Sequence, residues 1–245
     1  MLGLPDHITA LLFDLDGVLT QTAKVHDRAW KQTFDAFLRR RDGDAFTPFD
    51  AEKDYDEYVD GKPRYDGVRD FLHSRGIALP EGSPSDAPDS ETVCGIGNGK
   101  NELVLELIKR DGVQAYEGSV RFVTAARDAG LRRAVVSSSA NCRDVLVAAG
   151  IEDLFEARID GRTADEQHLK GKPHPDTFLA GARALGVEPA HAAVFEDALA
   201  GVQAGRDGHF GYVVGVDRVG QADELREHGA SVVVTDLAEL LAGGA

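Results

Sequence analysis

The sequence predicts an α/β protein: a Rossmann-like core of three layers, in which helices cover both faces of a parallel sheet, with a small helical domain inserted into it. Two observations predict this fold. Short, unbroken apolar runs alternate with amphipathic stretches of helical period along most of the chain. After the first apolar run, about 90 residues follow that contain helical patterns and no strand pattern. Such a stretch indicates an inserted domain.

Five apolar runs have the length and composition of strands in a parallel sheet. Such strands are buried on both faces, so they are apolar throughout instead of alternating with polar residues. The first run ends sharply, because acidic residues and a glycine follow it at once. The five runs are residues 10–13, 134–136, 192–195, 212–214 and 232–234.

Amphipathic stretches lie between these runs in the second half of the chain. They cover residues 120–129, 142–149, 177–185 and 198–206. Several are followed by glycine, the common residue at the C-terminal end of a helix. Because strand–helix–strand units place their strands in parallel, this alternation predicts one parallel sheet with helices on both faces.

The segment from residue 21 to residue 114 departs from the alternation. Its clearest helical patterns cover residues 23–39 and 102–109. Residues 76–89 collect Gly, Pro, Ser and Asp, as an exposed loop does. We therefore expect residues 1–20 and 115–245 to form the α/β core domain, and residues 21–114 to form the inserted helical domain.

The composition is that of an ordinary globular protein with an excess of negative charge. With 42 acidic and 27 basic residues, the chain carries a formal net charge of -15, which disfavours binding to nucleic acid and to anionic lipid. The apolar run near the N-terminus is far shorter than the roughly 20 residues of a membrane-spanning helix. Cys94 and Cys142 lack the spacing of a metal site or a disulfide framework. We expect a cytoplasmic protein without nucleic acid or membrane as a partner.

Carboxylates gather at the predicted carboxyl ends of two strands. Asp14 and Asp16 follow the first strand, and Gly17 then lets the chain turn. Glu196 and Asp197 end the strand that begins at residue 192. This edge of a parallel sheet is where α/β proteins bind ligands. Clustered carboxylates resist ionising together unless a cation neutralises them, and hard oxygen ligands suit Mg²⁺.

Two further strand ends offer groups that bind an anion. Ser137, Ser138, Ser139 and Asn141 follow the second strand and open a helix, so hydroxyls and backbone N–H groups can converge on phosphate oxygens. Lys172 precedes another helix and adds a positive charge. Together the four strand ends supply a nucleophile, metal ligands, hydroxyls and a cation, which are the parts that phosphoryl transfer needs.

The order of these motifs, DxDGxxT, Ser-Ser, Lys-Pro and Glu-Asp, resembles the four motifs of the haloacid dehalogenase superfamily over nearly the whole chain. The resemblance implies that Asp14 attacks phosphorus to form an aspartyl phosphate and that Asp16 is the general acid and base. It also implies that Asp14, the Asp16 backbone carbonyl and Asp197, helped by Glu196, bind Mg²⁺. Lys172 and Ser137 would then hold the phosphoryl oxygens.

The inserted domain has the position of the small helical cap of this superfamily, which usually selects the substrate. Thr22, His26 and Trp30 are spaced by four residues and so share one helix face. These three residues, together with Arg64 and Lys100, resemble the substrate-binding cap residues of sugar-phosphate mutases in the superfamily. The resemblance implies a phosphosugar substrate and a sugar bisphosphate activator, and we expect the protein to be a monomer.

Alternative functions remain open at this point. A sugar-phosphate phosphatase would use the same core, and a sensor would bind the sugar phosphate without turnover, although a sensor has no need of both Asp14 and Asp16. Residues 95–100 are rich in glycine but lack the pattern of a nucleotide-binding loop, and no strand precedes them. Compared with the mutases, Gln21 replaces an acidic residue, Ala140 replaces a lysine, and residues 76–92 are additional.

Overall fold

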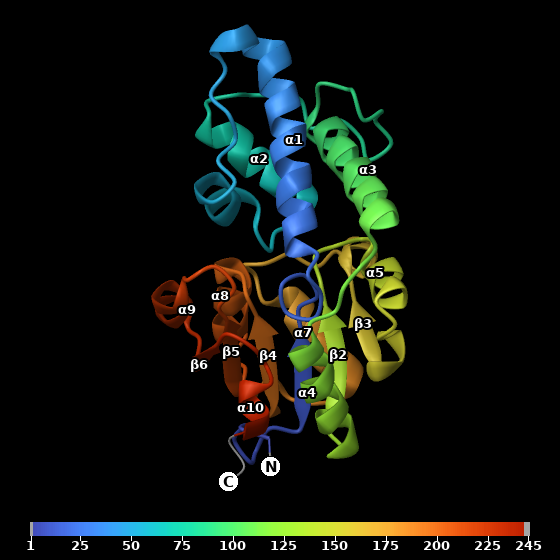
Figure 1. Ribbon diagram of the computed structural model, residues 1–245, viewed down its shortest axis with the longest axis vertical. Coiled ribbons are helices and arrows are strands. Elements are labelled where there is room, and N and C mark those ends of the chain that lie inside the picture. Colours follow the sequence, from blue (N-terminus) through green and yellow to red (C-terminus); the bar gives the residue numbers. More distant parts are fainter. Residues whose placement is uncertain (1, 243–245) are drawn as a thin grey trace. The chain divides into compact units, whose positions relative to one another are not determined.

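The computed structural model describes residues 2–242, and the chain divides into two compact units. One unit is formed by the chain up to Gln21 and from Val113 onward, and the other is Thr22–Gly112. Among the described residues, all strands belong to the first unit, whereas the second consists of helices and loops (Figure 1). The first unit is the core and the second is called the cap below.

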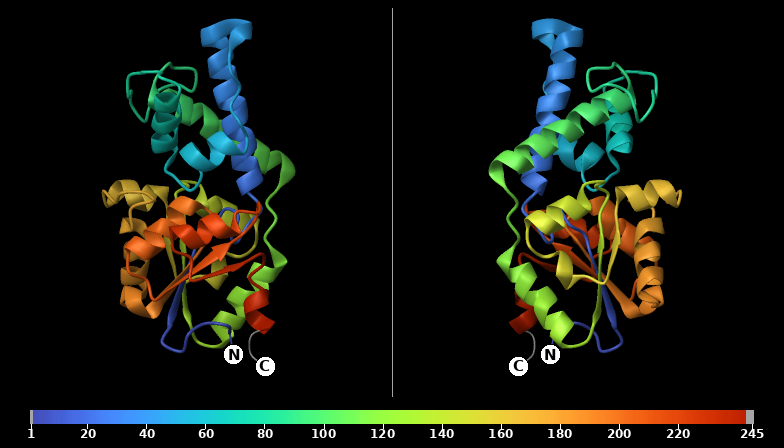
Figure 2. Two further views of the ribbon diagram at one scale, coloured as in Figure 1. Left: turned by 90° about the vertical axis from the view of Figure 1, so that its left-hand side faces the viewer. Right: turned by 90° about the vertical axis from the view of Figure 1, so that its right-hand side faces the viewer.

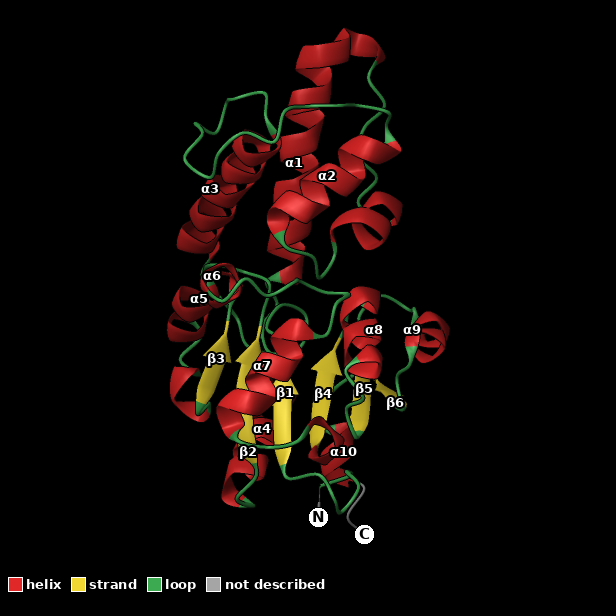
Figure 3. Cartoon of the chain, turned by 180° about the vertical axis from the view of Figure 1, so that it is seen from behind, coloured by secondary structure: helices red, strands yellow, loops and turns green. Residues whose placement is uncertain are grey.

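A six-stranded sheet forms the centre of the core. The strands are β1 (Ala10–Phe13), β2 (Arg132–Val136), β3 (Ala157–Ile159), β4 (Ala192–Glu196), β5 (Tyr212–Val216) and β6 (Val232–Val234). Their order across the sheet is β3-β2-β1-β4-β5-β6, and every neighbouring pair is parallel (Figure 3). The predicted fold class is therefore confirmed.

Strand β1 lies between β2 and β4, and all four of its residues are buried. The last residue of β1, Phe13, is level with Val135 in β2 and with Phe195 in β4. Because the strands are parallel and in register, the chain leaves β1, β2 and β4 at one edge of the sheet. The residues that follow these three strands are thus brought together by the topology.

Helices cover both faces of the sheet. Figure 2 shows α4 on one face and α7 on the opposite face. Phe13 packs on the first face against Phe122 of α4, with ring centroids 6.3 Å apart. Leu12 points to the other face, where Gly181 lets the backbone of α7 approach it closely. The core helices are α4 (Glu117–Asp128), α5 (Cys142–Ala148), α6 (Gly161–Glu166), α7 (Asp176–Leu185), α8 (Leu199–Asp207), α9 (Ala222–His228) and α10 (Glu239–Ala242).

Strand β3 was not predicted from the sequence. It has only three residues, and Arg158 interrupts its apolar pattern. Its pairing with β2 places it at the edge of the sheet, where an arginine can reach a polar partner. Arg158 does so, because its Nε donates to Asp160 over 2.8 Å.

The cap is a helical unit with an aromatic core. Its helices are α1 (Ala23–Asp42), α2 (Arg64–Ser74) and α3 (Val93–Asp111), with a short 3₁₀ helix, η1 (Gly43–Ala45), and a π-helical turn, η2 (Tyr55–Val59). Phe34 lies at the centre of the aromatic cluster. Its ring centroid is 4.1 Å from that of Phe71, 5.1 Å from Trp30 and 5.3 Å from Phe49.

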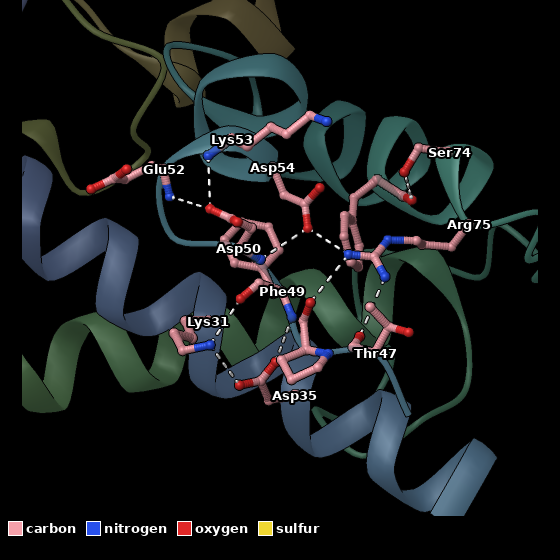
Figure 4. Close-up of polar contacts among 12 residues, drawn as sticks. Lys31, Asp35, Thr47, Phe49, Asp50, Glu52, Lys53, Asp54, Ser74 and Arg75 are labelled. Carbon is pink, nitrogen blue, oxygen red and sulfur yellow. Dashed lines mark hydrogen bonds and ion pairs between the residues drawn. The ribbon is translucent and has the colours of Figure 1, made fainter. Parts of the chain in front are cut away.

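Polar contacts fix the loop between η1 and η2 to the helices on either side of it (Figure 4). Lys31 of α1 donates to the backbone carbonyl of Phe49, and Asp35 accepts from the N–H of the same residue over 2.7 Å. Arg75, at the end of α2, donates to the carboxylate of Asp54 over 2.5 Å. These contacts hold the loop so that Phe49 reaches the aromatic cluster.

Helix α3 begins well before the predicted start at residue 102. The side chain of Thr92 accepts from the N–H of Gly95 and so caps the helix. The glycines that follow weaken the helical pattern in the sequence, yet the structure continues the helix through them. No helix within residues 2–242 is both long enough and apolar enough to cross a membrane.

Candidate active site in the core

Three carboxylates meet where β1 and β4 end. Asp14 directly follows β1, and its N–H donates to the carbonyl of Phe195 in β4 over 2.9 Å. Glu196 is the last residue of β4, and Asp197 follows it. Carboxylate oxygens of these three residues lie within 4.8 Å of one another. The structure thus brings together the two acidic motifs that the sequence placed at strand ends.

Lys172 is buried between two of these carboxylates. Its Nζ donates to Asp14 and to Glu196, each over 2.5 Å, and lies 3.3 Å from the carbonyl of Val136 at the end of β2. The side chain is only 1% exposed. The lysine therefore links the ends of β1, β2 and β4, and it fixes one oxygen of the Asp14 carboxylate.

The electrostatics of this cluster favour an additional cation. Burial raises the pKa of Asp14 to about 6, although the charge of Lys172 opposes the rise. Burial likewise raises the pKa of Glu196 to about 7. Burial alone would lower the pKa of Lys172, but the two carboxylates outweigh it and hold that pKa above its ordinary value. One lysine thus leaves the carboxylates incompletely neutralised.

The donor set fits a divalent metal ion. Carboxylate oxygens are hard ligands, and a bound divalent ion would stabilise the charged forms of Asp14 and Glu196, which burial disfavours. Both oxygens of Glu196 already accept hydrogen bonds, from Lys172 and from the N–H of Ala198. Asp14 and Asp197 are therefore the better placed ligands of the three.

Asp16 belongs to a tight turn that follows Asp14. The N–H of Gly17 donates to the carbonyl of Thr20 over 2.8 Å, and Thr20 in turn bonds to the carbonyl of Leu15. Gly17 has a φ of +83°, and a Cβ at this position would overlap the carboxylate of Asp197. Only glycine therefore permits this turn beside Asp197. Asp16 itself is half-buried.

The polar segment after β2 forms a compact turn. The N–H of Ser139 donates to the hydroxyl oxygen of Ser137 over 3.1 Å. The N–H of Asn141 donates to the hydroxyl oxygen of Ser139 over 3.2 Å. Ser137 is buried, as is Asn141, whereas Ser138 is half-buried. The turn begins one residue after Val136, whose carbonyl contacts Lys172.

Three of the predicted cap residues form a second cluster, inside the cap. The Nζ of Lys100, in α3, lies 2.8 Å from Nδ1 of His26, in α1, and 4.5 Å from the ring centroid of Trp30. Burial, and then the charge of Lys100, lowers the pKa of His26 well below its ordinary value. The neutral imidazole therefore accepts a hydrogen bond from the lysine. Thr22, the first residue of the cap, is also buried.

Arg64 belongs to another element of the cap, the helix α2. It is the first residue of α2 and is half-buried. Its Nη2 donates to the hydroxyl of Tyr65 over 3.1 Å, and its guanidinium lies 4.8 Å from the centroid of the Tyr65 ring.

Two residues that support the acidic loops were missed by the sequence analysis. Arg218, after β5, donates from Nε to the carbonyl of Gly17 over 2.7 Å and stacks on the ring of Tyr116. Gln221 donates to the backbone carbonyl of Asp197 over 3.1 Å. Both belong to a polar segment at the end of β5. The signal that identified the other strand ends, polar residues directly after an apolar run, applies here as well.

Comparison with known proteins agrees with this architecture. Residues 8–209 match the model of the haloacid dehalogenase-like hydrolase family. The chain is 56% identical to a β-phosphoglucomutase of Mycobacterium bovis over 98% of its own length and 94% of that protein's length. It is 31% identical to the β-phosphoglucomutase of Bacillus subtilis, over 94% of its own length and 91% of that protein's.

A solved structure supports the same relationship. The crystal structure of β-phosphoglucomutase from Clostridium difficile superposes on 95% of this chain and 93% of that one, with a TM-score of 0.75 and 26% identity. The chain therefore belongs to the haloacid dehalogenase-like hydrolase family, as a phosphotransferase-type enzyme that resembles the β-phosphoglucomutases.

Proposed function

We propose that this protein is a Mg²⁺-dependent β-phosphoglucomutase, which interconverts β-glucose 1-phosphate and glucose 6-phosphate through the 1,6-bisphosphate. The observation that carries the proposal is the Asp14 carboxylate, buried beside Glu196 and Asp197 and held by Lys172, in a chain that is 56% identical to a β-phosphoglucomutase over nearly its full length.

Asp14 is the nucleophile in this mechanism. Lys172 holds one oxygen of its carboxylate, which orients the other for in-line attack on phosphorus. The lysine charge also offsets repulsion between the carboxylate and the incoming phosphoryl group. The hydroxyl oxygen of Ser137 accepts from the N–H of Ser139, and in this mechanism the hydroxyl hydrogen donates to a phosphoryl oxygen. Ser138, Ser139 and Asn141 contribute to the same binding site.

Asp16 moves the proton in each half-reaction. Phosphorylated Asp14 transfers its phosphoryl group to the 6-hydroxyl of β-glucose 1-phosphate, while Asp16 takes the proton of that hydroxyl. The bisphosphate then returns its 1-phosphoryl group to Asp14, and Asp16 gives the proton to the departing O1. Glucose 6-phosphate is released, and the phosphorylated enzyme is restored.

Mg²⁺ is the metal that these ligands fit. Asp14, Asp197 and the backbone carbonyl of Asp16 would hold it, with Glu196 beside them. When bound, the ion neutralises negative charge on the phosphoryl oxygens and on the carboxylates. The incomplete neutralisation by Lys172 supports this assignment, because the pKa of Asp14 stays near 6.

The cap residues select the substrate. Arg64 binds the phosphate that is not being transferred, since a guanidinium forms paired hydrogen bonds with phosphate oxygens. His26, Trp30 and Lys100 form one cluster, and with Thr22 they contribute to binding the sugar. The proposal further includes a bisphosphate activator, a monomeric state and a cytoplasmic location, the last supported by two cysteines that are both free thiols.

The test is to compare the rate at which the protein forms glucose 6-phosphate with the rate at which it releases free phosphate. The enzyme is incubated with Mg²⁺, β-glucose 1-phosphate and a trace of glucose 1,6-bisphosphate, and both glucose 6-phosphate and free phosphate are followed. We expect glucose 6-phosphate to form much faster than phosphate, and neither to form with Asp14→Asn. Faster release of phosphate would instead identify a sugar-phosphate phosphatase, the alternative that the same core allows.

A further inference from the structure

Two features of the cap sequence are not explained by the proposed reaction. Residues 76–92 form an additional segment between α2 and α3, and Gly95, Gly97 and Gly99 alternate along the first turns of α3. Glycine inside a helix is unfavourable relative to alanine. Three of them in five residues therefore indicate that something lies very close to the helix backbone.

The additional segment packs directly on two of these glycines. Gly95 and Gly99 are one helical turn apart and so lie on the same face of α3. A Cβ at Gly99 would lie 3.0 Å from the carbonyl oxygen of Pro88, and a Cβ at Gly95 would overlap the carbonyl oxygen of Ser90. The segment can therefore approach the helix only where side chains are absent.

The third glycine accommodates the ring of Tyr65. A Cβ at Gly97 would lie 2.7 Å from Cδ1 and 2.9 Å from Cε1 of that ring. The ring of Tyr65 thus rests on the backbone of α3, while Tyr65 itself belongs to the first turn of α2. This contact joins the beginnings of two cap helices beside Arg64.

A chain of hydrogen bonds runs from Arg64 to the additional segment. Nη2 of Arg64 donates to the hydroxyl of Tyr65 over 3.1 Å, and this hydroxyl donates to Oδ1 of Asn98 over 2.9 Å. Nδ2 of Asn98 donates to the carbonyls of Pro84, over 3.1 Å, and Asp86, over 2.9 Å. The Tyr65 hydroxyl therefore both accepts and donates a hydrogen bond, and so does the side-chain amide of Asn98.

The additional segment is itself held in one conformation. The carboxylate of Asp86 accepts from the N–H of Ser83 and from the hydroxyl of Thr92, which also caps α3. The hydrogen bond from Thr92 lowers the pKa of Asp86, so this carboxylate remains charged. Outside the hydrogen-bonded chain, Arg69 of α2 pairs with Glu81 over 3.1 Å. The segment is therefore a fixed support for Asn98.

We propose that Tyr65 and Asn98, supported by residues 80–92, are positioning residues that hold the Arg64 guanidinium ready for the second phosphate of the substrate. This inference rests on the proposed role of Arg64. An arginine side chain loses much rotamer freedom when it binds a phosphate, and a side chain that is already held loses less. The supported arginine thus favours sugars that carry two phosphates over small monophosphates.

The test measures binding, so it does not depend on turnover. Glucose 1,6-bisphosphate and inorganic phosphate are titrated by calorimetry into wild-type protein, Tyr65→Phe, Asn98→Ala, Arg64→Ala and the double variant Arg64→Ala/Tyr65→Phe. We expect Tyr65→Phe to weaken bisphosphate binding about three- to tenfold, the range for one hydrogen bond, and to leave phosphate binding unchanged. In the Arg64→Ala background, Tyr65→Phe should have no further effect.

The matched control is Tyr58→Phe, which removes a hydroxyl from another cap tyrosine that lies 6.4 Å from Phe71 between ring centroids. Thermal unfolding of every variant checks that the cap stays folded. The inference is overturned if Tyr65→Phe binds bisphosphate like the wild type while Arg64→Ala does not, or if the two substitutions weaken binding independently. If the wild type binds bisphosphate but shows no isomerase activity, the proposed function is contradicted. The coupling between Tyr65 and Arg64 in bisphosphate binding can still be measured in that case.

Discussion

Replacing Lys172 with methionine should destabilise the metal-free protein in a strongly pH-dependent way. The lysine is 1% exposed and bonds to Asp14 and Glu196, both buried. Removing one partner of a buried ion pair costs about 3–5 kcal/mol when the other partner stays charged. Methionine has a similar length and apolar stem, so the change removes chiefly the charge.

The sign of the pH dependence follows from the pKa values of the two carboxylates. Folding raises them to about 6 for Asp14 and about 7 for Glu196. Between these values and the ordinary pKa of a carboxyl group, the folded state holds protons that the unfolded state has released. Protonation of the two carboxylates therefore adds to the free energy of unfolding. This contribution is full below about pH 4 and is lost as pH rises through 6 and 7. At pH 5 both carboxylates are largely neutral, so losing Lys172 should cost clearly less than it does at pH 8.

The assay is thermal unfolding followed by circular dichroism at pH 5 and at pH 8 in the presence of EDTA. At pH 8 the loss of about 3–5 kcal/mol in the free energy of unfolding corresponds to a fall in Tm of about 6–20 °C for a chain of this length. Lys170→Met is the matched control, because Lys170 lies in the same loop and is exposed. Equal destabilisation by Lys172→Met at both pH values would refute the electrostatic account of the site.

Three further outcomes are expected. Calorimetric Mg²⁺ affinity should rise from pH 5 to pH 8 and then level, because the metal must displace protons from carboxylates whose pKa values lie near 6 and 7; an affinity independent of pH would contradict this. Arg218→Ala should slow isomerisation about tenfold or more, since it removes a charged hydrogen bond to the Gly17 carbonyl; unchanged kcat would show that the bond has no such role. Arg75→Ala should lower the free energy of unfolding, measured with urea, by about 1–3 kcal/mol, since it leaves the carboxylate of Asp54 without its cation; no change would mean that the pair contributes nothing.

The sequence predicted the strand ends well for a physical reason. Strands buried on both faces must be apolar throughout, so β1 and β4 stand out, and the polar residues that follow them stand out as well. Because the strands are parallel, Asp14 and Glu196 had to meet at one edge. The family resemblance then assigned chemical roles that the pattern of residues could not assign.

The features that were missed depend on contacts between distant segments. Helix α3 was predicted to begin at residue 102, since glycines weaken a helical pattern, and only the structure reveals that residues 87–90 and the ring of Tyr65 occupy the space that the glycines leave. Strand β3 is too short to give a periodic signal. The polar run after β5 marks Arg218 as a strand-end residue, but it does not reveal that the partner is the carbonyl of Gly17, about 200 residues away in the sequence.

The nucleophile is the centre of the account, and trapping the phosphorylated protein tests it most directly. The enzyme is mixed with Mg²⁺ and radiolabelled glucose 1,6-bisphosphate, quenched in acid within the first turnovers, and digested for peptide mapping. The account predicts label on Asp14 alone, and no label in Asp14→Asn even though that variant stays folded. Label on another residue, or undiminished labelling of Asp14→Asn, would contradict the assignment of Asp14 as the group that accepts the phosphoryl.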